Sequence, residues 1–243
     1  MLAVRMLSLG VVQPVASVLL TRALTSPLAR ASAAHPRCQL SQGQDLNEQF
    51  ELYAPPASMD ECVPMGQEPR PLGVRKPRGE VHKDGDWHRS VHVWILDGED
   101  RMLLQQRSMQ KDTNPGCWDV SCAGHITAGD TSLETAQREL QEEIGMSVTI
   151  EELKQSWIRT VPSQDVGSTE KHGGYICREF QDLYLLRCDS LALDQLSLCE
   201  GEVAAVKWLR SSEVLYAWKN EDSKFVRREQ LYRQIIADAI TQR

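Results

Sequence analysis

AGHITAGDTSLETAQRELQEEIGM, from Ala123 to Met146, is the stretch of the chain that decides its fold. Thr131 followed by Glu134 is a capping-box pattern, which predicts that a helix begins there. Gly145 stands where a left-handed C-terminal cap is expected. Between these ends an apolar stripe recurs at helical spacing, made by Leu133, Ala136, Leu140 and Ile144. The stretch therefore predicts a capped amphipathic helix.

The polar face of this helix crowds three carboxylates together. Glu139, Glu142 and Glu143 follow one another at helical spacing, so their side chains are neighbours on the helix surface. Like charges at this spacing destabilise a helix by roughly 0.2–0.5 kcal/mol per pair. A divalent cation that prefers oxygen ligands, Mg²⁺ or Mn²⁺, would turn this repulsion into binding. Considered alone, such a cluster is more often a solvated charged face than a metal site.

The spacing of the whole stretch resembles the Nudix box, the signature of the Nudix hydrolase superfamily. The matching positions are Gly124, Asp130, Arg138-Glu139-Leu140, Glu142-Glu143 and Gly145-Met146. Asp130 departs from the pattern, because the family usually has glutamate there. The resemblance implies that Glu139, Glu142 and Glu143 bind the metal, while Arg138 orients a glutamate through a charge-assisted hydrogen bond.

The N-terminal segment differs in composition from the rest of the chain. The chain has 243 residues and a formal charge of −7, yet residues 1–44 contain arginine and no acidic residue. This bias resembles a mitochondrial or plastid transit peptide, expected to be disordered. One alternative is a secretory signal. The other is a disordered N-terminus without a targeting function, in a cytoplasmic protein. Residues 45–80 are rich in proline and predict an irregular lead-in, and residues 81–243 are expected to form the Nudix domain.

Cysteine usage and charge exclude several classes of protein. The 7 cysteines contain no CxxC pair, so free thiols are expected in preference to a disulfide framework. The acidic balance argues against nonspecific binding to nucleic acid. No apolar run is long and clean enough to predict a membrane span. The Nudix resemblance implies a small-molecule partner.

Alternating and helical patterns together predict an α+β fold. VHVWIL and RMLLQQR, joined by DGED, predict a β-hairpin. Further strands are expected at residues 118–124, 156–162, 175–188 and 203–209, and further helices at residues 211–218 and 225–240. This mixture fits a sandwich, and the Nudix resemblance implies an α/β/α sandwich with a mixed central sheet.

A second resemblance extends outside the box, from about His82 to Leu209. LLQQRSMQKDTNPGCWDVSCAGH, residues 103–125, resembles the isopentenyl-diphosphate isomerases, which share the Nudix fold. That family places an essential cysteine directly before the Gly/Ser-His pair, where this chain has Ala123. Cys122 precedes it, and adjacent side chains of a strand point to opposite faces. Cys122 is therefore expected in the core, and the missing cysteine argues against isomerisation.

Other positions of the isomerase pattern persist. The resemblance implies that His88, His125 and Glu179 bind a metal, with His82 nearby at a spacing one residue shorter; this donor set suits Mn²⁺ or Zn²⁺. For His88 and His125 an ordinary hydrogen-bonded role stays open. His92 and His172 are interpreted as core or surface residues.

The resemblances imply metal-dependent hydrolysis of a diphosphate linked to a group X, in a nucleoside diphosphate derivative or related organic diphosphate. Arg107 and Lys111 match residues that hold the isomerase substrate's diphosphate; ordinary loop cations are the alternative. A box glutamate, Glu200 or Glu202 would accept the water's proton. Trp87, Trp118 or Tyr175 would stack on X or fill core. The rival functions are an isopentenyl-diphosphate isomerase and a binding module without catalysis.

Overall fold

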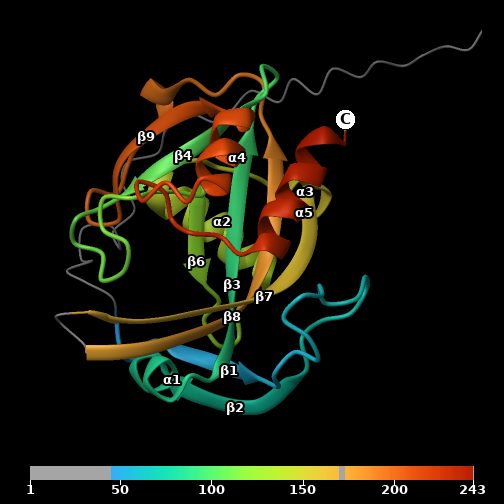
Figure 1. Cartoon of the computed structure of the whole chain (residues 1–243), viewed down its shortest axis with the longest axis vertical. Coiled ribbons are helices and arrows are strands. Elements are labelled where there is room, and N and C mark those ends of the chain that lie inside the picture. Colours follow the sequence, from blue (N-terminus) through green and yellow to red (C-terminus); the bar gives the residue numbers. More distant parts are fainter. Residues whose placement is uncertain (1–44, 170–172, 243) are drawn as a thin grey trace, which may run out of the picture.

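The structure is a computed structural model that describes residues 45–169 and 173–242. The predicted transit peptide lies outside these residues, as does His172. Within them nine strands join a single sheet (Figure 1). The strands are β1 Gln49–Tyr53, β2 Pro71–Pro77, β3 Trp87–Leu96, β4 Arg101–Arg107, β5 Trp118–Asp119, β6 Cys122–His125, β7 Trp157–Thr169, β8 Gly173–Arg187 and β9 Val203–Arg210. The helices are α1 Arg78–Asp84, α2 Ser132–Ile144, α3 Ile150–Ser156, α4 Ser211–Lys219 and α5 Gln230–Thr241, with a 3₁₀ turn at Leu193–Gln195.

Strand β3 is the centre of the sheet. It pairs antiparallel with β1, β4 and β6, and parallel with β8 from Trp87↔Arg178 to Leu96↔Arg187. The sheet is therefore mixed, as predicted. Because the β3–β8 register is parallel and long, side chains from these two distant segments stand beside one another on each face.

Helix α2 forms where its end signals predict. The Thr131 hydroxyl accepts a hydrogen bond from the Glu134 amide at 3.2 Å, and the Glu134 carboxylate accepts one from the Thr131 amide at 3.0 Å. Gly145 ends the helix with φ of 71°, a left-handed conformation that glycine adopts without a Cβ penalty. These caps fix both ends of α2, and its apolar residues Leu140 and Ile144 face the sheet.

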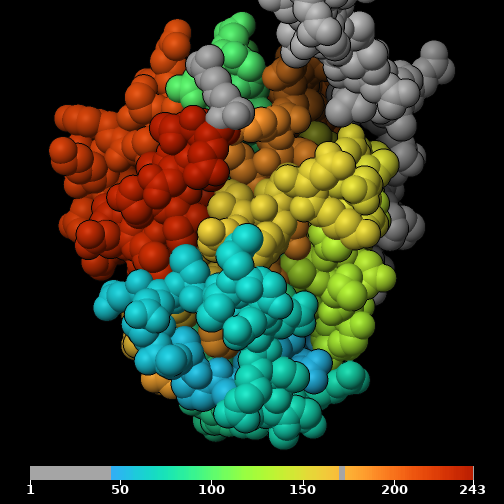
Figure 2. All heavy atoms as spheres, turned by 90° about the vertical axis from the view of Figure 1, so that its right-hand side faces the viewer, coloured from blue at the N-terminus to red at the C-terminus, as the bar shows by residue number. Residues whose placement is uncertain are grey.

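Each face of the sheet carries its own core, so the α+β sandwich is confirmed. On one face Leu140 and Ile144 of α2 and Leu153 of α3 pack over Val91 and Val93 of β3. On the other face α4 and α5 cover the sheet with a cluster that includes Val214, Trp218, Tyr232, Ile236 and Trp94. Burying each of these large side chains contributes about 1.5–3 kcal/mol. Figure 2 shows α5 in red above the blue and cyan residues of β1, β2 and their connection.

Residues 45–80, predicted to be an irregular lead-in, contain β1, β2 and the start of α1, and residues 54–70 between the two strands form neither helix nor strand. Strand β1 buries Phe50 and Leu52 and pairs with β3 at Tyr53↔Trp87. Pro71 and Pro77 lie at the ends of β2, an edge strand, which tolerates a residue without an N–H donor. The other prolines of this segment lie in the connection between β1 and β2: Pro55, Pro56, Pro64 and Pro69.

Three boundaries also differ from prediction. Helix α3 was not expected, and α5 begins at Gln230 rather than at residue 225. Strand β7 runs on to Thr169, beyond the predicted end at residue 162, and β8 begins at Gly173 rather than at residue 175. No helix among the described residues is long and apolar enough to cross a membrane.

Candidate active site

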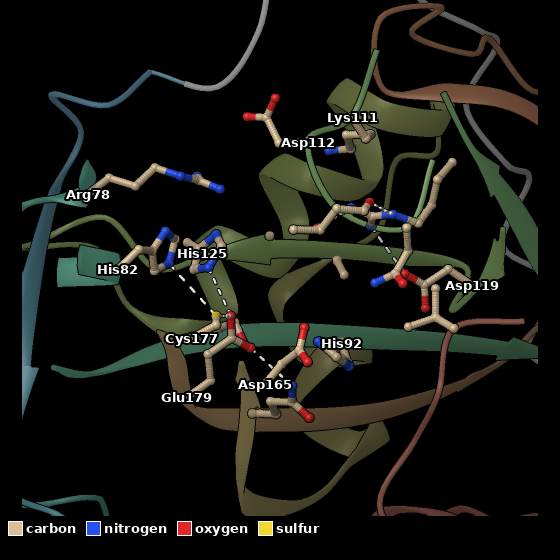
Figure 3. A pocket seen from close by; sticks show the side chains of 18 of the residues that line it. Arg78, His82, His92, Lys111, Asp112, Asp119, His125, Asp165, Cys177 and Glu179 are labelled. Atoms are coloured by element: carbon tan, nitrogen blue, oxygen red, sulfur yellow. Dashed lines mark hydrogen bonds and ion pairs between the residues drawn. The ribbon is translucent and has the colours of Figure 1, made fainter. Parts of the chain in front are cut away.

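A cavity of about 1170 Å³ collects most of the predicted site residues. Its walls come from α2, β6, β8, the loop after β4 and the segment before α5. Every residue predicted to bind metal lines it except His88, which is buried directly behind the wall. Figure 3 shows how side chains from these elements converge.

The acidic side of the cavity is the polar face of α2. Glu139, Glu142 and Glu143 all line it. Arg138 lies against two of them, with its Nη1 2.8 Å from Glu139 Oε1 and 3.1 Å from Glu142 Oε2. A single guanidinium nitrogen thus lies within ion-pair distance of two carboxylates.

The protonation of these carboxylates fits a site for a divalent cation. Burial, with the nearby charge of Glu143, raises the pKa of Glu139 to about 8. Burial raises the pKa of Glu143 as well, against the attraction of Lys111. Arg138 and Lys111 offset only part of the repulsion in this cluster, since the pKa values of Glu139 and Glu143 remain raised. Mg²⁺ or Mn²⁺ would supply further positive charge through the oxygen ligands these ions prefer.

Gly124 makes room for this cluster. A Cβ atom built on Gly124 would overlap the Glu139 carboxyl group. Any residue with a Cβ atom at this position would therefore require the Glu139 side chain to move from its place beside β6. This is a specific packing reason for the glycine of the Nudix-box pattern.

Lys111 and Arg107, the predicted phosphate-binding residues, differ in how many protein groups already occupy their donors. Lys111 lines the cavity and forms an ion pair with Glu202, the predicted proton acceptor. Arg107 also lines the cavity, but its Nε donates to the Thr113 carbonyl at 3.0 Å and its Nη1 pairs with Asp119 at 3.2 Å. Arg107 therefore holds the loop that carries Lys111 as well as facing the cavity.

A second donor cluster lies beside the first. His82, His88, His125 and Cys177 place one potential ligand atom each within 4.8 Å of one another. Glu179 joins them, because its Oε1 lies 2.9 Å from His125 Nε2 and 3.6 Å from His88 Nε2. The parallel register pairs His88 directly with Glu179, and β6 carries His125 to the same place.

Lowered pKa values keep His82 and His125 neutral, and a backbone contact orients His88. Burial and the neighbouring His88 lower the pKa of His82 to about 3. Burial and the charge of Arg78 hold the pKa of His125 well below its ordinary value. His88 Nδ1 lies 3.1 Å from the Asp86 carbonyl, to which it would donate, and this leaves the Nε2 lone pair facing the cluster. Neutral imidazoles with a carboxylate and a thiol suit Mn²⁺ or Zn²⁺.

The cavity contains alanine at the position where the isomerases have their essential cysteine. Ala123 lines the cavity, and only its methyl group is presented there. Cys122 is fully buried in the core beneath α2, as predicted. Burial and the charge of Glu143 hold the pKa of the Cys122 thiol well above its ordinary value. Cys122 therefore does not replace the missing thiol.

Several other candidates lie away from the cavity. Glu200 and Asp130 are exposed and outside its lining, so Glu202 alone of the two loop glutamates reaches it. Trp87 packs against Phe180 in the core, and Trp118 packs under Lys207. Tyr175 does line the cavity, with its hydroxyl donating to Asp165 at 2.8 Å.

The cavity lining also includes charged and thiol side chains that sequence reasoning missed, among them Arg78, Asp119, Cys177 and Arg228. Cys177 had a usable signal, because it lies two residues before Glu179 on a strand and so shares its face. Arg228 had none, since it was expected inside a helix. It instead precedes α5 and forms an ion pair with Asp119.

The fold and the site define an α+β protein in which one carboxylate-rich helix, cationic side chains and a histidine cluster share a cavity. A model of the NUDIX domain matches residues 86–228, which is more than half of the chain. The chain therefore belongs to the Nudix family, as the sequence resemblance predicted.

Individual relatives agree with this membership. The chain is 44% identical over 156 residues to Nudix hydrolase 3 of Arabidopsis thaliana, covering 63% of this chain and 20% of that protein. It is 42% identical over 73 residues to an isopentenyl-diphosphate delta-isomerase of Serratia proteamaculans, covering 30% and 41%. A Nudix hydrolase of Listeria monocytogenes, described as uncharacterized, is 30% identical over 137 residues, covering 56% and 72%. The chain thus spans less than half the length of the first two.

Solved structures resemble the chain only broadly. The Deinococcus radiodurans protein DR0079 has a TM-score of 0.44 at 18% identity, covering 78% of this chain and 98% of that one. The Escherichia coli dihydroneopterin triphosphate pyrophosphohydrolase also has a TM-score of 0.44, at 21% identity, covering 63% and 95%. At these scores the structures carry no argument about substrate.

Proposed function

We propose that this protein hydrolyses the diphosphate linkage of a compound in which diphosphate is joined to a group X. The observation that supports this most directly is the arrangement of Glu139, Glu142 and Glu143 around Arg138 at the cavity wall. Mg²⁺ or Mn²⁺ bound there would neutralise phosphate charge and acidify a water.

The chain's own residues divide the remaining work. Arg138 keeps Glu139 and Glu142 at a fixed separation, so that the ligand oxygens are positioned before substrate arrives. Lys111, with Arg107 behind it, provides positive charge for phosphate oxygens that the metal leaves uncompensated. The cavity also keeps these charges largely away from bulk water, which strengthens their interaction with substrate.

Glu202 is the proposed proton acceptor. It lines the cavity, whereas Glu200 lies outside. Its ion pair with Lys111 would exchange when phosphate oxygens take the lysine, which frees the carboxylate to accept the proton of the attacking water. A box glutamate is the alternative acceptor, and Glu202→Gln distinguishes the two through the loss of the acidic limb of the pH–rate profile.

We also propose that His88, His125 and Glu179 bind a second divalent ion, together with His82 and Cys177. The close convergence of these donors supports the proposal. Metal content measured by mass spectrometry after dialysis against Zn²⁺ or Mn²⁺ tests it. His125→Ala should lose one equivalent of metal, while Glu142→Gln should retain that equivalent.

The decisive experiment incubates the protein with Mg²⁺ or Mn²⁺ and a panel of nucleoside diphosphate derivatives and prenyl diphosphates. Phosphate, nucleotide and isomer products are followed together. Glu142→Gln should lower turnover by at least about 10²-fold, because it removes a ligand that acts in the transition state. Gln141→Ala is the matched control, since Gln141 neighbours Glu142 on α2 but does not line the cavity. Unchanged turnover in Glu142→Gln would contradict the proposed site.

The isomerase is the second candidate, because the histidine cluster and the Serratia relative favour it. It predicts dimethylallyl diphosphate from isopentenyl diphosphate without release of phosphate. Ala123 opposes it, since a methyl group cannot transfer a proton. Isomer formation by the unmodified chain would therefore replace the hydrolase proposal. A protein that bound these diphosphates tightly without any turnover would be the non-catalytic module.

Mitochondrial or plastid targeting by residues 1–44 is also proposed, on composition alone. Residues 1–44 fused to a fluorescent protein should accumulate in one of these organelles. A fusion in which the four arginines are replaced by glutamine is the control, and diffuse cytoplasmic fluorescence of the unmodified fusion would contradict the proposal.

A further inference from the structure

Glu143 is the most buried of the three glutamates that α2 turns to the cavity, and protein donors hold its carboxylate from behind. It lines the cavity, yet it is only 4% exposed. Its Oε2 accepts a hydrogen bond from Gln105 Nε2 at 3.2 Å and a longer one from the Ala123 amide at 3.4 Å. Both donors therefore contact the same carboxylate oxygen.

These two donors come from strands that have parted from one another. Strand β4 pairs with β3 as far as Ile95↔Leu103 and then continues beside β5 and β9, whereas β6 pairs with β3 from Ser90 to Val93 (Figure 1). Gln105 lies on β4 beyond the point where this strand leaves β3. The Glu143 carboxylate thus connects β4 to β6 where the two strands have separated.

Gln105 is a polar side chain in an apolar layer. It shares a face of β4 with Leu103, which belongs to the core beneath α2. Gln105 is 3% exposed and lies outside the lining of the cavity. Burying an amide among apolar side chains is unfavourable unless the amide is hydrogen-bonded, and the Glu143 carboxylate provides such a partner. Gln105 therefore contacts the carboxylate without reaching the space that a substrate would occupy.

The chemistry of this contact suits the support of a metal ligand. An ionised carboxylate only accepts hydrogen bonds, so the amide nitrogen of Gln105 is the atom that faces Glu143. The amide carries no charge. It orients the carboxylate and leaves the negative charge for a cation, whereas a lysine or arginine in its place would form an ion pair with Glu143.

We infer that Gln105 is a positioning residue, which holds the Glu143 carboxylate in the orientation in which it binds the divalent ion. Gln105 itself touches neither the ion nor the substrate. The inference rests on the proposed function, because it takes the glutamates of α2 to be metal ligands.

Binding of Mn²⁺ in the absence of substrate tests this role apart from turnover. The full chain is titrated with Mn²⁺, and the free ion is followed by its electron paramagnetic resonance signal. Gln105→Met keeps the length of the side chain and removes the donor. It should weaken Mn²⁺ binding at α2 by about 10-fold or more, since groups that orient metal ligands commonly contribute that much. Unchanged binding in Gln105→Met would overturn the inference.

A double-mutant cycle shows whether Gln105 acts through Glu143. In a chain that already carries Glu143→Gln, adding Gln105→Met should change Mn²⁺ binding by less than about 2-fold, because the carboxylate that Gln105 orients is gone. Ions bound at the histidine cluster contribute equally to all four proteins of the cycle. The same loss from Gln105→Met in both backgrounds would mean a merely structural role and overturn the inference.

Two further variants separate orientation from packing. Gln105→Asn keeps an amide but shortens its reach by one methylene, so it should weaken Mn²⁺ binding less than Gln105→Met does, and it replaces Gln105→Met in the cycle if that variant fails to fold. Gln137→Met is the matched control on α2, since the Gln137 amide donates to the Val148 carbonyl at 2.6 Å. A loss in Gln137→Met as large as that in Gln105→Met would overturn the inference.

Failure of the positioning role and failure of the proposed function give different results. Mn²⁺ binding that Glu143→Gln leaves unchanged would contradict the metal site itself, and the role of Gln105 with it. Binding that Glu143→Gln weakens and Gln105→Met does not would overturn the inference alone. Turnover is measured separately in the unmodified chain. The expected binding pattern without hydrolysis of any diphosphate would contradict the proposed function and support the positioning role.

Discussion

The carboxyl group of Glu139 lies against the backbone of Gly124, in space that the Cβ atom of any other residue would fill. Helix α2 and strand β6 therefore meet at a point where the Glu139 side chain leaves no space for a Cβ atom on residue 124. This contact also sets the distance between the carboxylates of α2 and the histidine that follows Gly124 on β6, so that both donor clusters face one cavity.

Gly124→Ala should reduce turnover by about 10²-fold, because a metal ligand displaced by about 1 Å loses its productive geometry. The measurement is kcat with a good substrate at saturating Mg²⁺, together with the thermal midpoint. Gly79→Ala is the control, since its Cβ would meet Leu46 only at an ordinary 3.6 Å. Wild-type kcat in Gly124→Ala would show that the position of Glu139 does not matter.

Arg138→Gln should raise the Mg²⁺ concentration needed for half-maximal activity by about 10-fold or more, since groups that orient metal ligands commonly contribute that much. Activity is titrated with Mg²⁺ and with Mn²⁺. Arg233→Gln is a control at an arginine whose guanidinium bonds the Trp218 carbonyl instead. The interpretation of Arg138 fails if the two variants have the same metal dependence.

Lys111→Met should raise KM by about 10-fold, with a smaller change in kcat, because it removes a charge that binds phosphate oxygens in ground and transition states alike. The thermal midpoint is measured in parallel, because the ion pair with Glu202 is partly buried and its loss could also destabilise the fold. Lys154→Met, at a side chain that is 57% exposed, is the control. A kcat that collapses while KM stays constant would instead assign Lys111 to the chemical step.

His92→Gln should make unfolding less sensitive to acid. The pKa of His92 falls from 6.5 to about 3 in the folded protein, so only the unfolded chain takes up the proton between these values. Stability from the neutral ring is therefore complete above pH 6.5 and is lost as the pH falls toward 3. Urea unfolding should show wild type losing about 2 kcal/mol relative to His92→Gln between pH 7 and pH 5. Parallel pH curves for the two proteins would rule out a depressed pKa.

Ala123→Cys should introduce a thiol that iodoacetamide alkylates far faster than Cys122. Ala123 lines the cavity, whereas Cys122 is 0% exposed and has a raised pKa. Mapping the labelled peptides by mass spectrometry under native conditions separates the adjacent positions. Comparable labelling of Cys122 in the wild-type chain would reverse the assignment of the two faces of β6.

Local signals carried the sequence prediction furthest. Helix α2 was predictable because Thr131, Glu134 and Gly145 determine both of its ends without help from distant residues. Helix α3 had the same signature in Thr149 and Glu152, whose capping box the structure contains, and the signal was overlooked. The burial of Cys122 followed from alternation along a strand alone.

Contacts between residues that are far apart in the sequence could not be predicted from local patterns. The contact of Glu179 with His88 depends on the register of β3 against β8, which the alternation of either strand leaves undetermined. The isomerase resemblance identified His88 and Glu179 as candidate metal ligands, but it did not point to Cys177. Arg228 reaches Asp119 because Phe225 forms a bridge with Trp118, a contact between segments that have no shared pattern.

The members of the histidine cluster lie far apart in the sequence, and this has a consequence for folding. His88 and Cys177 are 89 residues apart, so closing the loop between them carries an entropic cost that no local structure offsets. The cluster comes into being only when β3 and β8 have paired. Colour from Co²⁺ added during refolding would therefore report the late, nonlocal step of assembly, and would stay absent from chains in which only α2 and the β3–β4 hairpin have formed.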